Sequence, residues 1–490
     1  MKIFLAIIAG LVTLFLILAV PGKDSPEMAG SSRKAFTWNQ DAFWPSLERQ
    51  YRNLRTRGCS ASDRTTPSEL SALRSITTRL ASIQVAADSP VLDTLENRFL
   101  LLGPVMAACP ASAREYFILS GQIRDAIKWQ SRGWDVNSND VRSRLYRSLY
   151  GTRAAAEEVM LHHPESLPPL LAGKNEPSIT PSTMVRGVEI HSGDILISRG
   201  GYPTSALIAR GNDFPGNFSH IALVYVDSVT HAAFTIEAHI ERGVAVSTAE
   251  QYLGDKKLRI LVLRPRADLP ALQTDPMLPH RAGSRAITRA RTERIPYDFA
   301  MDYTDPSRLF CSEVASAAYH QAGLNLWMGI STISNPGLRR WLSSFGVEHF
   351  ETQEPSDLEY DPQLVVVAEW RDPATLIKDH VDNAVIDAML EGAERGDKLT
   401  FPWYQLPLVR IAKGYSWVLQ QFGGIGPVPE GMSAASALRN SVFGKREARL
   451  ADQVAFRADS ARRVDGYPPP YWRLVDLARE AVSHEAGPRR

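Results

Sequence analysis

A short segment in the second half of the chain places a reactive side chain at the start of a predicted helix. Residues 309–325 read LFCSEVASAAYHQAGLN, in which apolar residues recur three or four positions apart until Gly323 supplies a stop signal. Cys311 lies at the entrance of this helix. The first helical turn offers backbone N–H groups and a partial positive charge, which lower the pKa of a thiol and stabilise an oxyanion. Cys311 is therefore a candidate nucleophile, and the alternative is a small core residue.

A nucleophilic cysteine requires a base, and the best candidate lies well upstream. His220 begins the run HIALVYV, whose apolar residues predict a largely buried strand. A structural histidine is the alternative there. Asp194 in HSGDILIS, Glu237 in FTIEAHI and Tyr297 just before the cysteine segment complete the set of candidate residues. The whole run thus predicts strands that carry polar groups, followed by one helix that carries the thiol.

The order of these segments resembles the circularly permuted papain-like cysteine hydrolases, the YiiX-like branch of the NlpC-type superfamily. The matching pieces are GDIL at 193–196, SHIALVY at 219–225, IEA at 236–238 and CSE at 311–313. The resemblance implies an α+β fold, in which a small antiparallel sheet packs against the cysteine-bearing helix and helical regions flank this catalytic domain. It implies no cofactor.

The resemblance also implies the roles of three residues. Cys311 would be the nucleophile, His220 the general base, and Glu237 the group that orients the imidazole and stabilises its charged form. A thiolate and imidazolium pair at rest is the expected consequence. His239, two residues after Glu237, is the alternative orienting group, as in relatives that use a second histidine.

Two further residues have supporting roles in this interpretation. Tyr297 is a candidate oxyanion donor beside the Cys311 amide, whereas Asp194 is expected to hold a turn or a backbone amide.

Two other features of the sequence bear on the site. Asp305 followed by a proline is a competing helix start, which would move Cys311 into the second turn and weaken the dipole argument. In the loop between the first two strands, Arg199 and Arg210 suit an anionic substrate group, although solvated charges are the alternative.

The reaction expected from the resemblance is hydrolysis of an amide or ester bond. The substrate would be a peptide, an acyl-amide or a lipid, and the sequence does not discriminate among cell-wall peptides, acylated lipids and acylated amino acids. The alternatives are a non-catalytic binding module that retains the fold, and an acyltransferase or lipase-like member of the same superfamily. The sequence leaves the oligomeric state open.

The amino terminus predicts export. Residues 1–22 contain an apolar run from residue 3 to residue 20 after a single lysine, which approaches the length of a membrane span. The run is longer than the usual signal-peptide core and lacks a clean cleavage site, so an uncleaved anchor is preferred over a cleaved signal. The predicted location is the inner membrane facing the periplasm, or the periplasm or medium after cleavage.

Composition and cysteine count agree with such a location. A formal net charge of +1 gives no basic excess, so a nucleic-acid partner is not expected. Cys59 and Cys109 are disulfide candidates in an oxidising compartment, which would leave Cys311 as the free thiol; two reduced, buried cysteines are the alternative. The histidines are scattered, and no metal site is expected.

Pattern and composition divide the rest of the chain. Residues 37–163 predict a helical domain, 164–184 a linker, 185–370 the catalytic domain, and 371–490 a C-terminal helical region. Within the last region, residues 402–424 combine tryptophans, tyrosines and basic residues. This stretch is expected to be a core helix that packs on the catalytic domain, and a helix at a membrane interface is the alternative.

Overall fold

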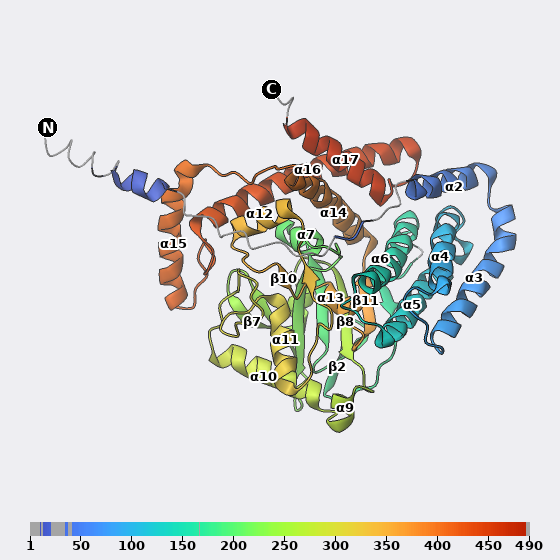
Figure 1. Cartoon of the computed structure of the whole chain (residues 1–490), viewed down its shortest axis with the longest axis horizontal. Helices are drawn as coiled ribbons and strands as arrows, with labels where there is room; N and C mark the ends of the chain where they lie inside the picture. Colours follow the sequence, from blue (N-terminus) through green and yellow to red (C-terminus); the bar gives the residue numbers. More distant parts are fainter. Residues whose placement is uncertain (1–9, 11–12, 21–34, 38–41, 166, 487–490) are drawn as a thin grey trace.

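A seven-stranded antiparallel sheet forms the centre of the molecule (Figure 1). The structure is a computed structural model, and it describes residues 10, 13–20, 35–37, 42–165 and 167–486. The strand order is β1-β11-β8-β4-β5-β6-β7. The strands span β1 (Leu170–Ala172), β4 (Ile195–Gly200), β5 (His220–Val226), β6 (Ala233–His239), β7 (Gly243–Thr248), β8 (Lys257–Pro265) and β11 (Leu364–Arg371).

The central strands are apolar on both faces, so both faces are covered. In β4 and β5, Ile195 and Ile221 belong to the core beneath the cysteine helix, whereas their neighbours Leu196 and Ala222 belong to a second core on the opposite face. This alternation follows from the two-residue repeat of a strand. It explains why these segments read as continuous apolar runs in the sequence.

The cysteine helix α11 (Cys311–Ala322) begins at Cys311 itself. The Glu313 carboxyl group accepts the backbone N–H of Phe310 at 2.7 Å, and Gly323, with φ 99°, ends the helix. Asp305 instead accepts the backbone N–H of Ser307 within a preceding turn. The alternative helix start at Asp305 is therefore not used, and Cys311 lies in the first turn.

Helices from the amino-terminal part of the chain pack beside the sheet. Figure 1 shows them grouped beside the β11 edge of the sheet. They are α2 (Phe43–Arg57), α3 (Ser60–Leu80), α4 (Pro90–Ala108), α5 (Ala113–Gln130) and α6 (Asn139–His162). A disulfide joins Cys59, just before α3, to Cys109, just after α4. In α5, Arg124 and Lys128 are buried together with its apolar residues.

The carboxyl-terminal region forms four long helices. These are α14 (Pro373–Glu394), α15 (Leu406–Gln421), α16 (Ala434–Asp465) and α17 (Tyr471–Ala486). The first and the last two of them pack on one another, while α15 projects along the side of the molecule (Figure 1). The expectation that residues 402–424 form a core helix is wrong, because most of the α15 surface is exposed.

Shorter elements connect these layers. The predicted linker 164–184 contributes β1 to the sheet edge and the start of the hairpin β2 (Ser182–Val185) and β3 (Val188–His191). The helix after β7, α8 (Ala249–Gly254), has its capping box at Thr248 and Gln251. The other elements are α7 (Pro203–Arg210), α9 (Pro270–Thr274), α10 (Leu278–Thr292), β9 (Ser331–Thr332), α12 (Pro336–Phe345), β10 (Glu351–Thr352) and α13 (Asp357–Tyr360).

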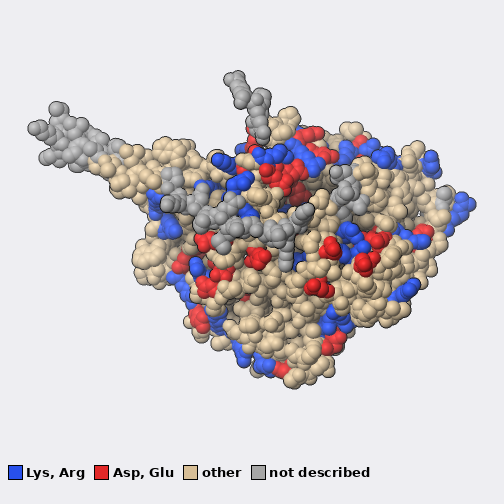
Figure 2. Space-filling model, in the orientation of Figure 1, with Lys and Arg blue, Asp and Glu red and all other residues tan. Residues whose placement is uncertain are grey.

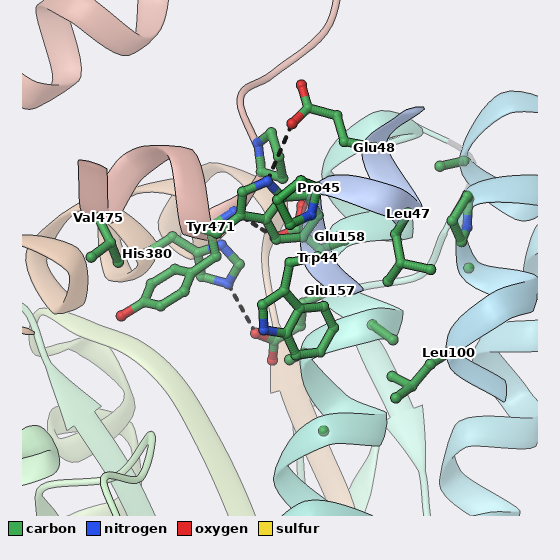
Figure 3. A pocket seen from close by; sticks show the side chains of 18 of the residues that line it. Trp44, Pro45, Leu47, Glu48, Leu100, Glu157, Glu158, His380, Tyr471 and Val475 are labelled. Atoms are coloured by element: carbon green, nitrogen blue, oxygen red, sulfur yellow. Dashed lines mark hydrogen bonds and ion pairs between the residues drawn. The ribbon is translucent and has the colours of Figure 1, made fainter. Parts of the chain in front are cut away.

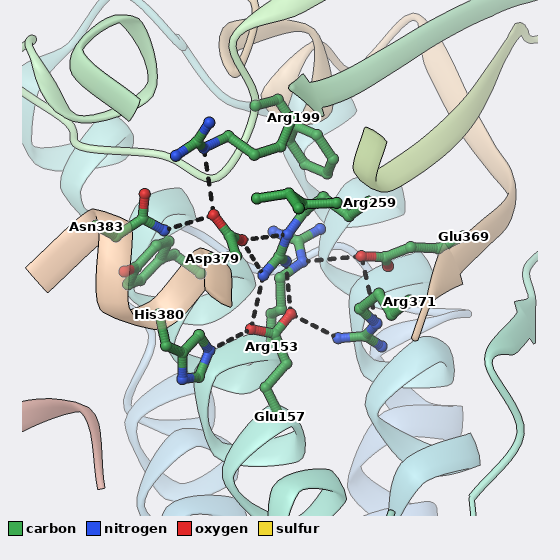
Figure 4. Close-up of polar contacts among 12 residues, drawn as sticks. Arg153, Glu157, Arg199, Arg259, Glu369, Arg371, Asp379, His380 and Asn383 are labelled. Carbon is green, nitrogen blue, oxygen red and sulfur yellow. Dashed lines mark hydrogen bonds and ion pairs between the residues drawn. The ribbon is translucent and has the colours of Figure 1, made fainter. Parts of the chain in front are cut away.

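A buried ionic network joins the helical regions to the sheet (Figure 4). Arg259 of β8 donates to Glu157 of α6 at 2.6 Å and to Asp379 of α14 at 2.8 Å. Arg371 of β11 also donates to Glu157, at 3.0 Å. Buried charges require partners, so these contacts fix the positions of α6 and α14 relative to the strands.

The surface mixes both signs of charge. Figure 2 shows lysine and arginine interspersed with aspartate and glutamate over the visible face. Among the helices that the structure describes, none combines the length and apolar composition needed to cross a bilayer. Most of the predicted anchor, residues 1–9, 11–12 and 21–22, lies outside the described residues, while residues 13–19 are helical.

Candidate active site

Adjacent strands hold a histidine and a carboxylate together. His220 is the first residue of β5, Glu237 lies near the end of β6, and the two strands pair directly. Nε2 of His220 lies 2.6 Å from Oε2 of Glu237. Burial by itself raises the pKa of Glu237, but the hydrogen bonds to His220 and His239 hold this pKa well below its usual range. Glu237 is therefore ionised.

The ionised carboxylate determines the tautomer of His220. A carboxylate only accepts hydrogen bonds, so Nε2 carries the proton and Nδ1 presents a lone pair. His239, the alternative orienting group, is not paired with His220: its Nε2 lies 3.5 Å from the other Glu237 oxygen, and the two rings are 6.0 Å apart. Glu237 therefore lies between the two imidazoles and forms its shorter hydrogen bond with His220.

The thiol of Cys311 lies against the start of β5. Its Sγ is 3.9 Å from the backbone oxygen of Ser219, the residue that precedes His220. Burial raises the pKa of the Cys311 thiol to about 12, and the carboxyl group of Glu354 contributes in the same direction. Burial also lowers the pKa of His220, although Glu237 opposes this effect.

These shifts make the resting thiol and imidazole neutral near pH 7. The expected thiolate and imidazolium pair is therefore not the resting state of this structure. The helix position of Cys311 is as predicted, but its side chain is only 4% exposed. Desolvation of a thiolate outweighs the stabilisation that one helix terminus provides. The sequence pattern predicts where the helix starts, but it does not predict how deeply the Cys311 side chain is buried.

Two acidic or phenolic groups lie within electrostatic range of the thiol. Tyr297 interacts with Cys311, and burial raises the pKa of its phenol well above the ordinary value, so the hydroxyl retains its proton. Glu354 is buried, which raises its pKa well above the usual range and keeps it protonated. The sequence analysis missed Glu354, because a single glutamate in the run QEPSD carries no signal of proximity to a cysteine.

Asp194 has a structural place beside the sheet. Its carboxylate accepts two hydrogen bonds from Arg264 of β8, both at 2.8 Å, and one from the backbone N–H of His191, also at 2.8 Å. These contacts close the turn between β3 and β4. In this arrangement the carboxylate holds a backbone amide and a buried guanidinium.

Arg199 in β4 and Arg210 after it are neither solvated nor directed at a substrate. Arg199 is fully buried and lies 3.2 Å from Asp379, as Figure 4 shows. Arg210, at the end of α7, donates to both carboxylate oxygens of Asp387, at 2.8 and 2.9 Å. Both expectations for these residues are therefore wrong. The sequence of a loop does not reveal partners that lie about 180 residues away in the chain.

A cavity of about 470 Å³ lies apart from these residues, between α2, α4, α6, α14 and α17 (Figure 3). Neither Cys311, His220 nor Glu237 lines it. Its lining glutamate Glu157 is bonded to His380 at 3.1 Å and to the arginines of the ionic network. The cavity therefore lies where these helices meet, and the charged side chains around it are largely paired with one another. In the described part of the chain, no group of three metal-binding side chains comes together.

The fold and the site define a permuted papain-like domain: an antiparallel sheet bears a histidine and a carboxylate, and a cysteine heads the helix packed on it. Residues 189–368 match the family model described as permuted papain-like amidase enzyme, YaeF/YiiX, C92 family. No curated protein and no solved structure matches the chain. The flanking helical regions lie outside the matched residues.

Proposed function

We propose that the protein is a thiol hydrolase that cleaves an amide or ester bond with Cys311, His220 and Glu237. The observation that carries the proposal is the 2.6 Å bond between His220 and Glu237 at the point where the Cys311 sulfur meets β5. The match of residues 189–368 to an amidase family model supports the reaction class.

In the first step, Nδ1 of His220 removes the proton of the Cys311 thiol as the sulfur attacks the substrate carbonyl carbon. The resulting imidazolium is stabilised by the ionised Glu237. The oxyanion receives hydrogen bonds from the first-turn amide of α11 and from the Tyr297 hydroxyl. Proton removal accompanies attack in this scheme, because the resting thiol is protonated.

The second step releases the leaving group. The tetrahedral intermediate collapses, its carbon–nitrogen or carbon–oxygen bond breaks, and His220 returns the proton to the departing amine or alcohol. A thioester on Cys311 remains. His220 then removes a proton from water, which attacks the thioester, and the carboxylic acid and the free thiol are regenerated.

We also propose that the enzyme is exported and anchored by its amino-terminal run, so that it meets peptide, acyl-amide or lipid substrates outside the cytoplasm. The apolar run of residues 3–20 and the disulfide between Cys59 and Cys109 both favour an oxidising compartment. An acyltransferase differs only in the acceptor that attacks the thioester, so it remains a variant of the same proposal.

A second candidate, a binding domain without turnover, is favoured by one observation. Burial raises the pKa of the Cys311 thiol to about 12, which disfavours the thiolate required for attack. The two functions differ in whether a covalent acyl-enzyme forms.

The test incubates the full-length protein with a panel of peptide anilides, N-acyl amino acids, phospholipids and simple esters. Acid quenching followed by mass spectrometry of the Cys311 peptide should reveal an added acyl group, together with released product. Cys311→Ser and His220→Ala should each abolish product release, while Glu250→Gln on the exposed surface leaves it unchanged. Binding of a panel compound with neither adduct nor product would establish the second candidate instead.

A further inference from the structure

Helix α15 presents its apolar residues to the outside of the molecule. Leu408, Ile411, Tyr415, Val418 and Phe422 follow one another at intervals of three or four residues, so they share one face of the helix. The side chains of these five residues are between 46% and 85% exposed. A surface helix of a globular domain normally turns such a face toward the core.

The inward face of α15 is apolar at its first turn, where Leu406 and Pro407 are buried, and polar beyond it. Ser416 and Gln420 are buried there, and the Ser416 hydroxyl accepts the backbone N–H of Val428 at 3.0 Å. Lys413 donates to the backbone oxygen of Met432 at 2.8 Å. The helix is therefore held in this orientation by specific hydrogen bonds. The exposed apolar face is a fixed feature of the fold.

Aromatic residues with polar groups border this apolar face. Trp403, Tyr404 and Trp417 are all more than half exposed. Tryptophan and tyrosine are enriched at the boundary between lipid headgroups and acyl chains, where the ring is buried and the N–H or O–H group remains hydrated. Exposed apolar patches of this kind mark membrane or protein contact sites.

The amino-terminal apolar run emerges at the same place. The Arg410 guanidinium on α15 donates to the backbone oxygens of Ile17 at 3.3 Å, Leu18 at 2.7 Å and Val20 at 2.7 Å. Figure 1 shows this described helical turn beside α15, pointing away from the body of the protein. Leu14, Phe15, Leu16 and Ile17 are exposed as well.

We propose that α15 lies in the interface of a lipid bilayer and, together with the adjoining amino-terminal run, forms a two-part membrane attachment. A bilayer accounts for both the exposed face of α15 and the exposed amino-terminal run. It can surround an apolar segment on all sides and can also cover one apolar face of a helix. A second protein copy would cover the α15 face and leave the amino-terminal run exposed.

The loop next to α15 also contacts the catalytic domain. The loop that follows α15 contains Glu430, which pairs with Arg294 at 2.6 Å, three residues before Tyr297. This ion pair therefore links the loop after α15 to the segment that carries Tyr297. The proposal itself stands whether or not Cys311 is catalytic.

The test places a nitroxide spin label on α15 in the full-length chain. Ile411→Cys carries the label, and Val464→Cys on α16, which is 86% exposed, serves as the matched control. Both variants also carry Cys311→Ser, so that the introduced cysteine is the free thiol. The protein is reconstituted into vesicles of phosphatidylethanolamine and phosphatidylglycerol, and the accessibility of the label to oxygen and to a water-soluble nickel chelate is measured.

The label at position 411 should gain oxygen accessibility and lose nickel accessibility by several-fold in vesicles, relative to the label at position 464. Equal nickel accessibility at the two positions would overturn the proposal. Dipolar broadening between labels at position 411, with the same shielding before vesicles are added, would show that a second copy covers the face and would overturn it as well.

Discussion

The carboxylate of Glu237 lies 2.6 Å from Nε2 of His220, and this single contact assigns both nitrogens of the ring. Because the ionised carboxylate accepts the Nε2 proton, Nδ1 is left as the basic atom. His239 is placed farther from the carboxylate, at 3.5 Å, and retains its own exposure to solvent. The orienting role in the proposed triad therefore belongs to Glu237.

The pH dependence of catalysis follows from the environment of His220. A general base acts in its neutral form, and burial lowers the pKa of His220 below its ordinary value of 6.5. The ratio kcat/KM should therefore rise with pH through a midpoint below 6.5. It should then stay level to well above pH 8, because the pKa of the Cys311 thiol is raised to about 12. A pH-rate profile with a cleaved panel substrate measures this, and a midpoint above 6.5 would contradict it.

Replacing the orienting carboxylate should change both rate and profile. Glu237→Gln removes the charge that raises the pKa of His220, so the acid limb should move to still lower pH. The rate should fall by roughly 10²- to 10⁴-fold, the size of a general-base contribution. His239→Gln is the matched control and should change kcat only slightly. A larger loss in the His239 variant than in the Glu237 variant would reverse the assignment.

The Cys311 thiol should react slowly with alkylating reagents at neutral pH. Since its pKa is raised to about 12, only a small fraction is thiolate at pH 7, far less than for a free cysteine with a pKa of about 8.5. The rate of iodoacetamide labelling, followed by mass spectrometry, should keep rising above pH 9. Glu354→Gln should shift the curve to lower pH, because the Glu354 carboxyl group ionises only at high pH and then places a negative charge near the sulfur. A wild-type midpoint below 8.5 would instead indicate a preformed thiolate.

The contrast between Cys311 and its surroundings shows what the sequence could predict. The strands carrying His220 and Glu237, and the helix start at Cys311, follow from local periodicity and from the order of segments. The pKa of the thiol depends on its burial and on the carboxyl group of Glu354, which comes from elsewhere in the chain. No local pattern contains that information, so the predicted sign of the thiol pKa shift was wrong while the position was correct.

Helix α15 illustrates a second limit. Its five apolar residues recur three or four positions apart, and the prediction of a helix there is confirmed. Periodicity identifies an apolar face but does not state whether that face meets the core or the surroundings. The same limit applies to Arg199 and Arg210, whose carboxylate partners Asp379 and Asp387 belong to α14.

The disulfide should make Cys59 and Cys109 unreactive in a titration of free thiols. Titration of the unfolded, unreduced protein should count one thiol, that of Cys311, because Cys59 and Cys109 are joined. Replacing both with serine should lower the free energy of unfolding by about 2–5 kcal/mol, since the bridge closes a long loop in the unfolded chain. Chemical denaturation measures the change. A count of three thiols would exclude the bridge.

The buried ionic network should be sensitive to the loss of a single member. Arg259→Met leaves Glu157 and Asp379 with fewer cationic partners, and breaking a buried pair in this way costs about 3–5 kcal/mol. Arg463→Met removes an exposed pair with Asp459 and should change the free energy of unfolding by less than about 1 kcal/mol. Denaturant melts of both variants compare the two sites, and equal effects would show that the network contributes no more than a surface pair.

Glu313 should make the protein less stable as the pH rises. Burial raises the pKa of this carboxyl group from 4.5 to about 9, so the folded protein retains a proton that the unfolded chain releases. A raised pKa in the folded state gives stability that is fully present below pH 4.5 and is lost progressively up to about pH 9.

Glu313→Gln isolates this effect. The amide resembles the protonated acid, its oxygen can still accept the Phe310 N–H, and it does not titrate. The difference in unfolding free energy between variant and wild type should therefore increase steadily in favour of the variant from pH 5 to pH 9. Taking the difference cancels the contributions of other buried acids, such as Glu447, whose pKa is also raised, to about 7. Denaturant melts at matched ionic strength provide the measurement, and a difference that stays constant with pH would show that Glu313 is ionised in the folded protein.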